Sequence, residues 1–109
     1  MGAEIERFQV HLVNLNPTRG AEMRKMRPVV VISPDEINRW LFAVVVAPMT
    51  TTIRPWPFRV DVTFDGKRGQ IALDQLRGID KTRCREYLGD VNQRTAATVS
   101  RRLQQMFSL

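Results

Sequence analysis

Two short, almost uninterrupted runs of apolar and β-branched residues constrain the fold of this 109-residue chain more than any other feature. Residues 28–32 read Pro-Val-Val-Val-Ile, and residues 41–47 read Leu-Phe-Ala-Val-Val-Val-Ala. Runs of this length and composition are typical of strands whose two faces are both buried, in the centre of a sheet or in a barrel core. We therefore expect a β fold, organised as one domain over residues 1–109.

Shorter segments predict further strands and a terminal helix. Alternation of apolar and polar residues predicts a half-buried strand at residues 8–12 and an amphipathic strand at residues 58–64, with Arg59 on its polar face. Patterns typical of strands also occupy residues 69–73 and 86–91. Asp65-Gly66 is a turn signal, and Asn92 is a suitable N-cap for a final helix. The apolar face of that helix would consist of Ala96, Val99, Leu103, Met106 and Phe107. The predicted fold class is mainly β with a C-terminal helix, in which roughly five to seven strands form a strongly curved sheet or compact barrel.

A short helical turn is expected between the two apolar runs. Ser33 can act as its N-cap, Pro34 suits the first helical position, and Glu36 would complete a capping box. The turn should run towards Trp40.

The charge of the chain indicates its partners. Lysine and arginine number 17 against 11 acidic residues, which gives a net charge of +6, and only three of the cations are lysines. Arginine binds phosphate and carboxylate with two parallel hydrogen bonds, so a nucleic acid or an acidic polypeptide is the expected partner. A merely soluble basic protein is the alternative.

The content of cysteine, histidine and apolar residues excludes several other classes. Cys84 is the only cysteine and His11 the only histidine, which argues against a disulfide and against a Cys/His metal site. We expect no cofactor, a structural or surface role for His11, and a reduced, cytoplasmic protein. No apolar run approaches the roughly 18 residues of a membrane span.

Two polar segments border the apolar runs and are candidates for chemistry. Arg27 precedes the first run, where Pro28 favours an extended backbone. Thr50 to Thr52 follow the second run. A permanent cation and a hydroxyl where loops leave a rigid sheet suit the handling of a phosphodiester. The alternatives are a surface arginine and a polar turn. For Asp74 and Gln75, after residues 69–73, a structural role is favoured.

With these segments in view, the chain resembles the MazF/PemK toxins of bacterial toxin–antitoxin systems. The resemblance runs from about residue 10 to residue 107, and the matching pieces are residues 15–22, 27–34, 47–51, 56–60 and 72–75. It implies a compact SH3-like barrel with a C-terminal helix, acting as a homodimer that an acidic antitoxin neutralises. The implied activity is metal-independent, sequence-selective cleavage of single-stranded RNA to 2′,3′-cyclic phosphate and 5′-hydroxyl ends.

The resemblance also assigns roles to residues. Arg27 matches the catalytic arginine of the family and Thr50 its catalytic threonine. Contacts to RNA are expected from the surrounding loops, namely from Thr18, Arg19, Glu22, Arg24, Lys25, Thr51, Thr52, Arg54 and Gln75. The chain departs from many relatives at Ala21, where a serine is common, and at Thr52, where a glutamine is common.

Two alternative functions belong to other classes. A CcdB-like gyrase poison shares the architecture but ends in Trp-Gly-Ile, whereas this chain ends in Phe107-Ser108-Leu109. A barrel that only binds RNA or an acidic protein would use exposed aromatic side chains. Aromatic residues make up 7% of this chain, and only Trp40 and Trp56 fall outside core-like positions.

Overall fold

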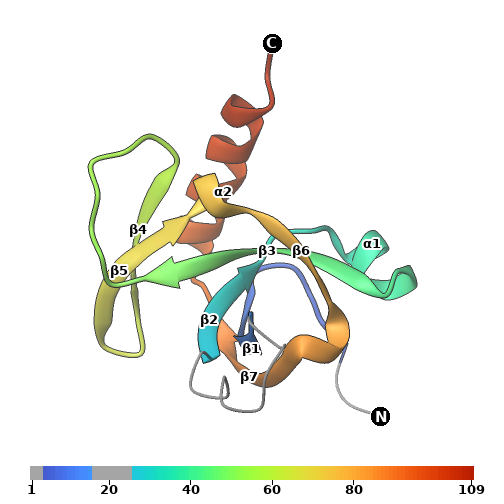
Figure 1. The fold of residues 1–109 in the computed structure, drawn as a ribbon. Coiled ribbons are helices and arrows are strands. Elements are labelled where there is room, and N and C mark those ends of the chain that lie inside the picture. Colours follow the sequence, from blue (N-terminus) through green and yellow to red (C-terminus); the bar gives the residue numbers. More distant parts are fainter. Residues whose placement is uncertain (1–3, 16–25) are drawn as a thin grey trace.

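The computed structural model describes residues 4–15 and 26–109 and shows a curved antiparallel sheet with a C-terminal helix (Figure 1). Its strands are β1 (Gln9–Asn14), β2 (Met26–Val31), β3 (Ala43–Thr50), β4 (Arg59–Phe64), β5 (Lys67–Ala72), β6 (Arg77–Asp80) and β7 (Cys84–Asp90). Its α-helices are α1 (Asp35–Trp40) and α2 (Gln93–Met106), and its 3₁₀ helices are η2 (Leu73–Gln75) and η3 (Lys81–Arg83). The predicted fold class, mainly β with a C-terminal helix, is confirmed.

Strand β3 is shared between two parts of the sheet. The strand order is β4-β5-β3-β2-β1-β7, and β6 pairs with the first half of β3. The last two residues of β3, Met49 and Thr50, pair instead with Ile71 and Gln70 of β5. Strands β7, β1, β2, β3 and β6 therefore curl around one space, while the β4–β5 hairpin continues from the end of β3 (Figure 1).

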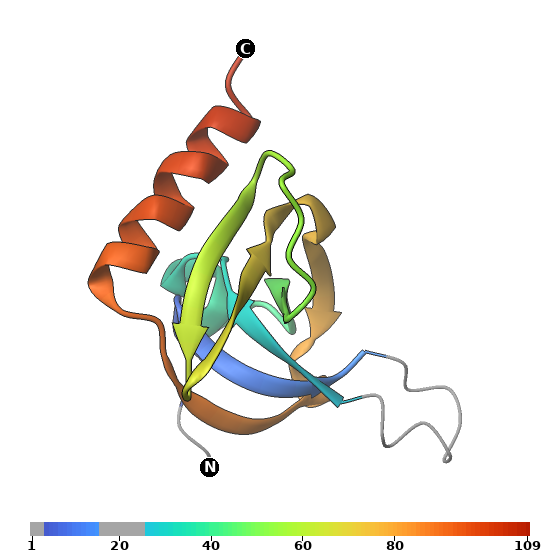
Figure 2. The ribbon, with the colours of Figure 1, turned by 90° about the vertical axis from the view of Figure 1, so that its left-hand side faces the viewer.

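Residues 29–32 and 44–47 of the apolar runs are covered on both faces, as predicted, because each face of the sheet has a core of its own. The prediction was wrong for Leu41, Phe42 and Ala43, which are exposed where the chain enters β3. The core inside the curl consists of Val13, Val29, Val31, Val44, Val46 and Ile79. The core on the other face consists of Val10, Val30, Ile32, Ala47, Val60, Val62, Ile71, Leu73, Val91 and Val99. Helix α2 covers this second core beside β4 (Figure 2). Neither α-helix of the described residues is long and apolar enough to cross a membrane.

Local predictions were confirmed at the turn of the β4–β5 hairpin and at the start of α2, whereas the prediction that Phe107 belongs to the apolar face of the helix was wrong. Asp65 and Gly66 have φ values of 54° and 77°, as a two-residue hairpin turn requires. The Oδ1 atom of Asn92 accepts a hydrogen bond from Thr95 N at 2.8 Å and caps α2. Val99 is buried at the centre of the helix, whereas Phe107 lies past its end and is exposed.

Two local predictions were wrong. Ser33 does not cap α1, because its hydroxyl donates to Asn38 Oδ1 and accepts from Val45 N, which fastens α1 to β3. Residues 8–12 were expected to form a half-buried strand. β1 instead lies between β2 and β7 and is covered on both faces, so that His11 is only 7% exposed.

Candidate functional site

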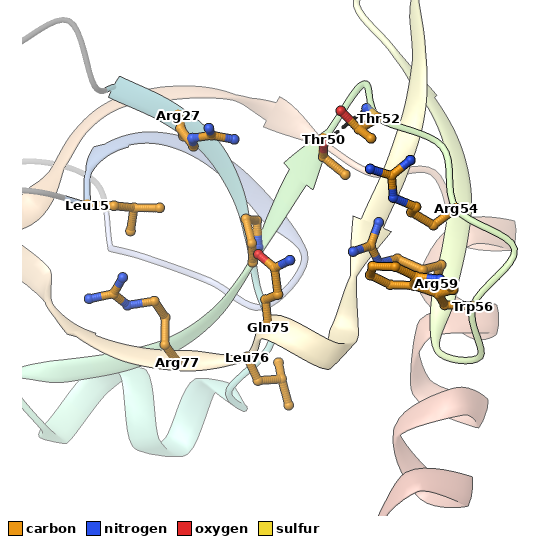
Figure 3. A pocket seen from close by; sticks show the side chains of 11 residues that line it. Leu15, Arg27, Thr50, Thr52, Arg54, Trp56, Arg59, Gln75, Leu76 and Arg77 are labelled. Carbon is orange, nitrogen blue, oxygen red and sulfur yellow. Dashed lines mark hydrogen bonds between the residues drawn. The ribbon is translucent and has the colours of Figure 1, made fainter.

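The pairing of β2 with β3 brings Arg27 and Thr50 to one cleft. Strands β2 and β3 pair Val31 with Val46 and Val29 with Pro48. This pairing ends at Val29 and Pro48, and Arg27 and Thr50 each lie two residues beyond it along their own strands. Residues directly opposite in an antiparallel pair project their side chains from the same face. Because side chains alternate along a strand, Arg27 shares the face of Val29 and Thr50 the face of Pro48. Both side chains line the same cleft at the edge of the core inside the curl (Figure 3).

Arg27 and Thr50 line one cleft of about 690 Å³. The described residues around it are Leu15, Arg27, Pro48, Thr50, Thr52, Arg54, Trp56, Arg59, Gln75, Leu76 and Arg77. Four of these residues are arginines, and none of those described is acidic. A concave surface lined by one sign of charge attracts ligands of the opposite sign, so this cleft favours an anion.

The hydroxyl of Thr50 is held in place by the chain that follows it. Its Oγ1 atom accepts a hydrogen bond from Thr52 N at 3.0 Å. A hydroxyl that accepts in this way still has its proton to donate. The backbone of Thr50 is held as well, since a Cβ atom at Gly69 would lie 2.4 Å from the Thr50 carbonyl oxygen. Only glycine at position 69 lets β5 approach β3 this closely.

Arg27 presents its guanidinium to solvent. Its side chain is exposed at the start of β2, and no described residue forms a hydrogen bond or ion pair with it. Pro28 follows it and pairs with Leu12 of β1. The backbone of Arg27 is thus fixed while its charge is available to a ligand.

Arg59 lies on the other side of the cleft and is engaged within the protein. Its Nε atom donates to Asp74 Oδ1 at 2.7 Å and its Nη2 to Asp74 Oδ2 at 3.4 Å, with the Arg59 side chain only 4% exposed. Its Cζ atom lies 4.6 Å from the centre of the Trp56 ring. The amphipathic pattern of residues 58–64 predicted Arg59 on the polar face, and the ion pair with Asp74 explains why it is buried instead.

Gln70 holds the loop that carries Thr52, Arg54 and Trp56. Its Oε1 atom accepts from Arg54 N at 3.0 Å, and its Nε2 donates to Arg54 O at 3.1 Å. Nε2 also donates to Asp61 Oδ1 at 3.1 Å. The Gln70 side chain thus makes the two main-chain hydrogen bonds that a neighbouring strand would otherwise make with Arg54. Because Gln70 lies in β5, these bonds fix the loop to the sheet.

The predicted binding residues fall into three groups. Thr52, Arg54 and Gln75 line the cleft, while Thr51 lies beside Thr50 in an adjoining hollow next to the β4–β5 turn. Thr18, Arg19, Glu22, Arg24 and Lys25 lie outside the described residues. Sequence reasoning missed six lining residues, namely Leu15, Pro48, Trp56, Arg59, Leu76 and Arg77. An aromatic residue amid arginines was the one signal that could have drawn attention to Trp56.

The groups with shifted pKa values lie away from the cleft. Burial lowers the pKa of His11, against the opposing effect of Asp90. Burial also raises the pKa of the Cys84 thiol. Within residues 4–15 and 26–109, no three His, Cys, Asp or Glu side chains come together as a metal site.

Solved structures share this fold over nearly the whole chain. MazF (Form-I) from Deinococcus radiodurans matches with a TM-score of 0.80 at 24% identity, covering 99% of this chain and 100% of that one. An endoribonuclease from a mycobacterial species matches with a TM-score of 0.80 at 25% identity, over 98% of this chain and 94% of that one. An endoribonuclease in complex with its cognate antitoxin, also mycobacterial, matches with a TM-score of 0.81 at 24% identity over 96% of both chains.

These likenesses define the fold as that of a small bacterial toxin. The family model described as the PemK-like, MazF-like toxin of type II toxin–antitoxin systems matches residues 6–107. The chain therefore belongs to the PemK/MazF toxin family.

Proposed function

We propose that this protein is an endoribonuclease toxin and that Arg27 and Thr50 carry the reaction in the arginine-lined cleft. One observation carries the proposal: the exposed cation of Arg27, which no described residue bonds, and the anchored hydroxyl of Thr50 line the same cleft, whose described lining has no acidic residue. The family, and the 25% identical mycobacterial endoribonuclease, support the same activity.

Single-stranded RNA is the substrate that this cleft suits. The phosphate backbone supplies the negative charge that the arginines attract. Unpaired bases leave their flat faces open to side chains, whereas a paired helix hides them. Thr52, Arg54 and Gln75 line the cleft beside Thr50. In this proposal they contact the nucleotides next to the cut.

The reaction uses the 2′-hydroxyl of the substrate as nucleophile. The 2′-oxygen bonds to the adjacent phosphorus and the bond from phosphorus to the 5′-oxygen breaks. The 2′-hydroxyl gives its proton to water, and the leaving 5′-oxygen takes a proton from water. Arg27 is always protonated and stabilises the charge that builds up on the phosphoryl oxygens. The hydroxyl of Thr50 donates a hydrogen bond to one of those oxygens and keeps its proton. This contact holds the phosphorus in position for attack.

The charge of the chain also indicates how the toxin is controlled. With a net charge of +6, the cleft attracts an acidic antitoxin that competes with RNA. The mycobacterial endoribonuclease was solved in complex with its cognate antitoxin. In this proposal residues 1–109 form one toxin domain, which works in the cytoplasm as a homodimer. Light scattering should then report about twice the chain mass of 12.6 kDa, and a monomer that cuts RNA would refute the dimer.

Cleavage in excess EDTA tests the proposal. Single-stranded RNA should be cut at a short motif, with 2′,3′-cyclic phosphate at one new end and a 5′-hydroxyl at the other. Thr50→Val should lower the rate while Thr50→Ser, which keeps the hydroxyl, should retain most of it. Cleavage only with added Mg²⁺ would refute the mechanism, and RNA binding without cleavage would leave a binding module instead of an enzyme.

A further inference from the structure

Trp56 is an exposed aromatic side chain in a cleft otherwise suited to phosphate. It is 49% exposed and lies in the segment between Thr50 and Arg59 (Figure 3). Half of a large apolar surface is left in water, so the packing of the core does not explain its position. A cleft that bound only phosphate groups would need its arginines and no aromatic ring.

Two arginine guanidinium groups contact the Trp56 ring. The guanidinium of Arg59 lies 4.6 Å from the ring centre, and Arg59 is itself fixed by Asp74. The guanidinium of Arg54 lies 5.6 Å from the same centre. Both contacts fall within the range of cation–π interactions. The orientation of the ring is therefore set before a ligand arrives.

The backbone that carries the ring is fixed as well. Gln70, which is 5% exposed, bonds both the N and O atoms of Arg54, two residues before Trp56. Two independent supports, one at the ring and one at the loop, hold an aromatic surface open towards the cleft. Single-stranded nucleic acids bind to such surfaces by stacking their bases on them.

We infer that Trp56 is the platform on which one unpaired nucleobase of the RNA stacks, while Arg27 holds a phosphate on the other side of Thr50. The inference rests on the proposed function, since it names how the same cleft takes its substrate. Trp56 contacts a base and takes no part in bond breaking. Arg59 and Asp74 are positioning residues, because they act through the ring.

Fluorescence of Trp56 can be measured alone in a Trp40→Phe background. Trp40 lies on α1, is 81% exposed and does not line the cleft. The probes are a short single-stranded DNA of mixed sequence, which lacks the 2′-hydroxyl and is not cut, and an abasic strand with the same number of phosphates. The base-bearing strand should quench Trp56 and bind roughly tenfold more tightly than the abasic one.

Substitution of Trp56 separates stacking from a structural role. Trp56→Leu should weaken binding of the base-bearing strand about tenfold and leave binding of the abasic strand unchanged. Trp56→Phe, which keeps an aromatic face, should retain most of the preference for bases. Thermal unfolding of each variant checks that the fold persists.

Three results would overturn the inference. They are equal binding of the two strands by the wild type, equal weakening of both by Trp56→Leu, and quenching by poly-glutamate but by neither strand. The last would assign the ring to an acidic partner. RNA cleavage in EDTA is scored separately. A protein that shows the stacking pattern but never cuts RNA would refute the enzyme and keep the platform.

Discussion

The two sides of the cleft use the same residue type in opposite ways. On one side Arg27 is exposed, and no residue of the described chain bonds to it. On the other side Arg59 is buried, ion-paired with Asp74 and packed against Trp56. Both arginines line the cleft, yet only the first keeps its hydrogen-bonding capacity for a ligand.

The difference follows from the free energy of burying charge. A buried guanidinium is tolerated only with a partner, and losing that partner is strongly destabilising. An exposed guanidinium needs no partner and contributes little to stability. Arg27 is therefore available to bind a ligand. On the other side of the cleft, Arg59 stabilises the positions of Asp74 and Trp56. Burial and partners, more than residue type, separate an arginine that is open to a ligand from one that is structural here.

The largest effect is expected at Arg27. Arg27→Ala should lower the RNA cleavage rate by roughly 10²-fold or more, because the main charge facing the phosphoryl oxygens is removed. Its free energy of unfolding should change by less than about 0.5 kcal/mol, as for other exposed sites. Arg101→Ala on the exposed face of α2 is the matched control and should change neither quantity. A near-normal rate for Arg27→Ala would remove this residue from the site.

Arg59 should show the reverse pattern. Arg59→Met should lower the free energy of unfolding by about 1–3 kcal/mol in urea denaturation, since the ion pair with Asp74 and the contact that supports Trp56 are both lost. The double variant Arg59→Met/Asp74→Asn should recover part of that loss if the two residues are coupled. Additive losses, or a variant as stable as the wild type, would contradict the structural role of Arg59.

Gly69 bears on the position of Thr50, because only a residue without a side chain lets β5 lie this close to the Thr50 carbonyl oxygen. Gly69→Ala should destabilise the fold by about 1–3 kcal/mol, as overpacking does. It should also slow cleavage by shifting the hydroxyl of Thr50. Gly78→Ala is the matched control, since its added Cβ would lie 3.9 Å from the nearest atom, Val44 O. Equal behaviour of the two variants would show that the close approach at Gly69 has no bearing on Thr50.

The smallest effect concerns pH and lies away from the cleft. Burial holds the pKa of His11 below its ordinary value of 6.5 in the folded state, and Asp90 partly opposes this. The unfolded chain therefore takes up the proton first, so stability is full above pH 6.5 and is lost as pH falls through the folded-state pKa. His11→Gln should flatten this decline in urea denaturation series between pH 7 and pH 5. An unchanged slope would assign the decline to other groups.

Local signals in the sequence predicted most of the elements. The apolar runs, the alternation of residues 58–64, the Asp65-Gly66 turn and the Asn92 cap each depend on neighbouring residues alone. β6 was not predicted, because only Ile79 in it is buried and it forms by pairing with β3. The sharing of β3 between two parts of the sheet is likewise a tertiary feature that no local pattern records.

The candidate site divides in the same way. Arg27 and Thr50 could be linked from the sequence, because Arg27 lies at the start of β2, Thr50 lies at the end of β3, and these two strands pair. Arg59 could not be recognised, since its burial depends on Asp74, a partner far along the chain. The lining role of Trp56 depends on the fixed loop, and that in turn depends on Gln70.

The contact between Gln70 and Arg54 has a consequence for how this toxin can change. The amide bonds only main-chain atoms, so every residue except proline offers the same N–H and C=O at position 54. The side chains of this loop can therefore be exchanged without releasing it from the sheet. Selection, or a designer with a randomised loop, can alter which RNA sequence is recognised while Arg27 and Thr50 keep their places.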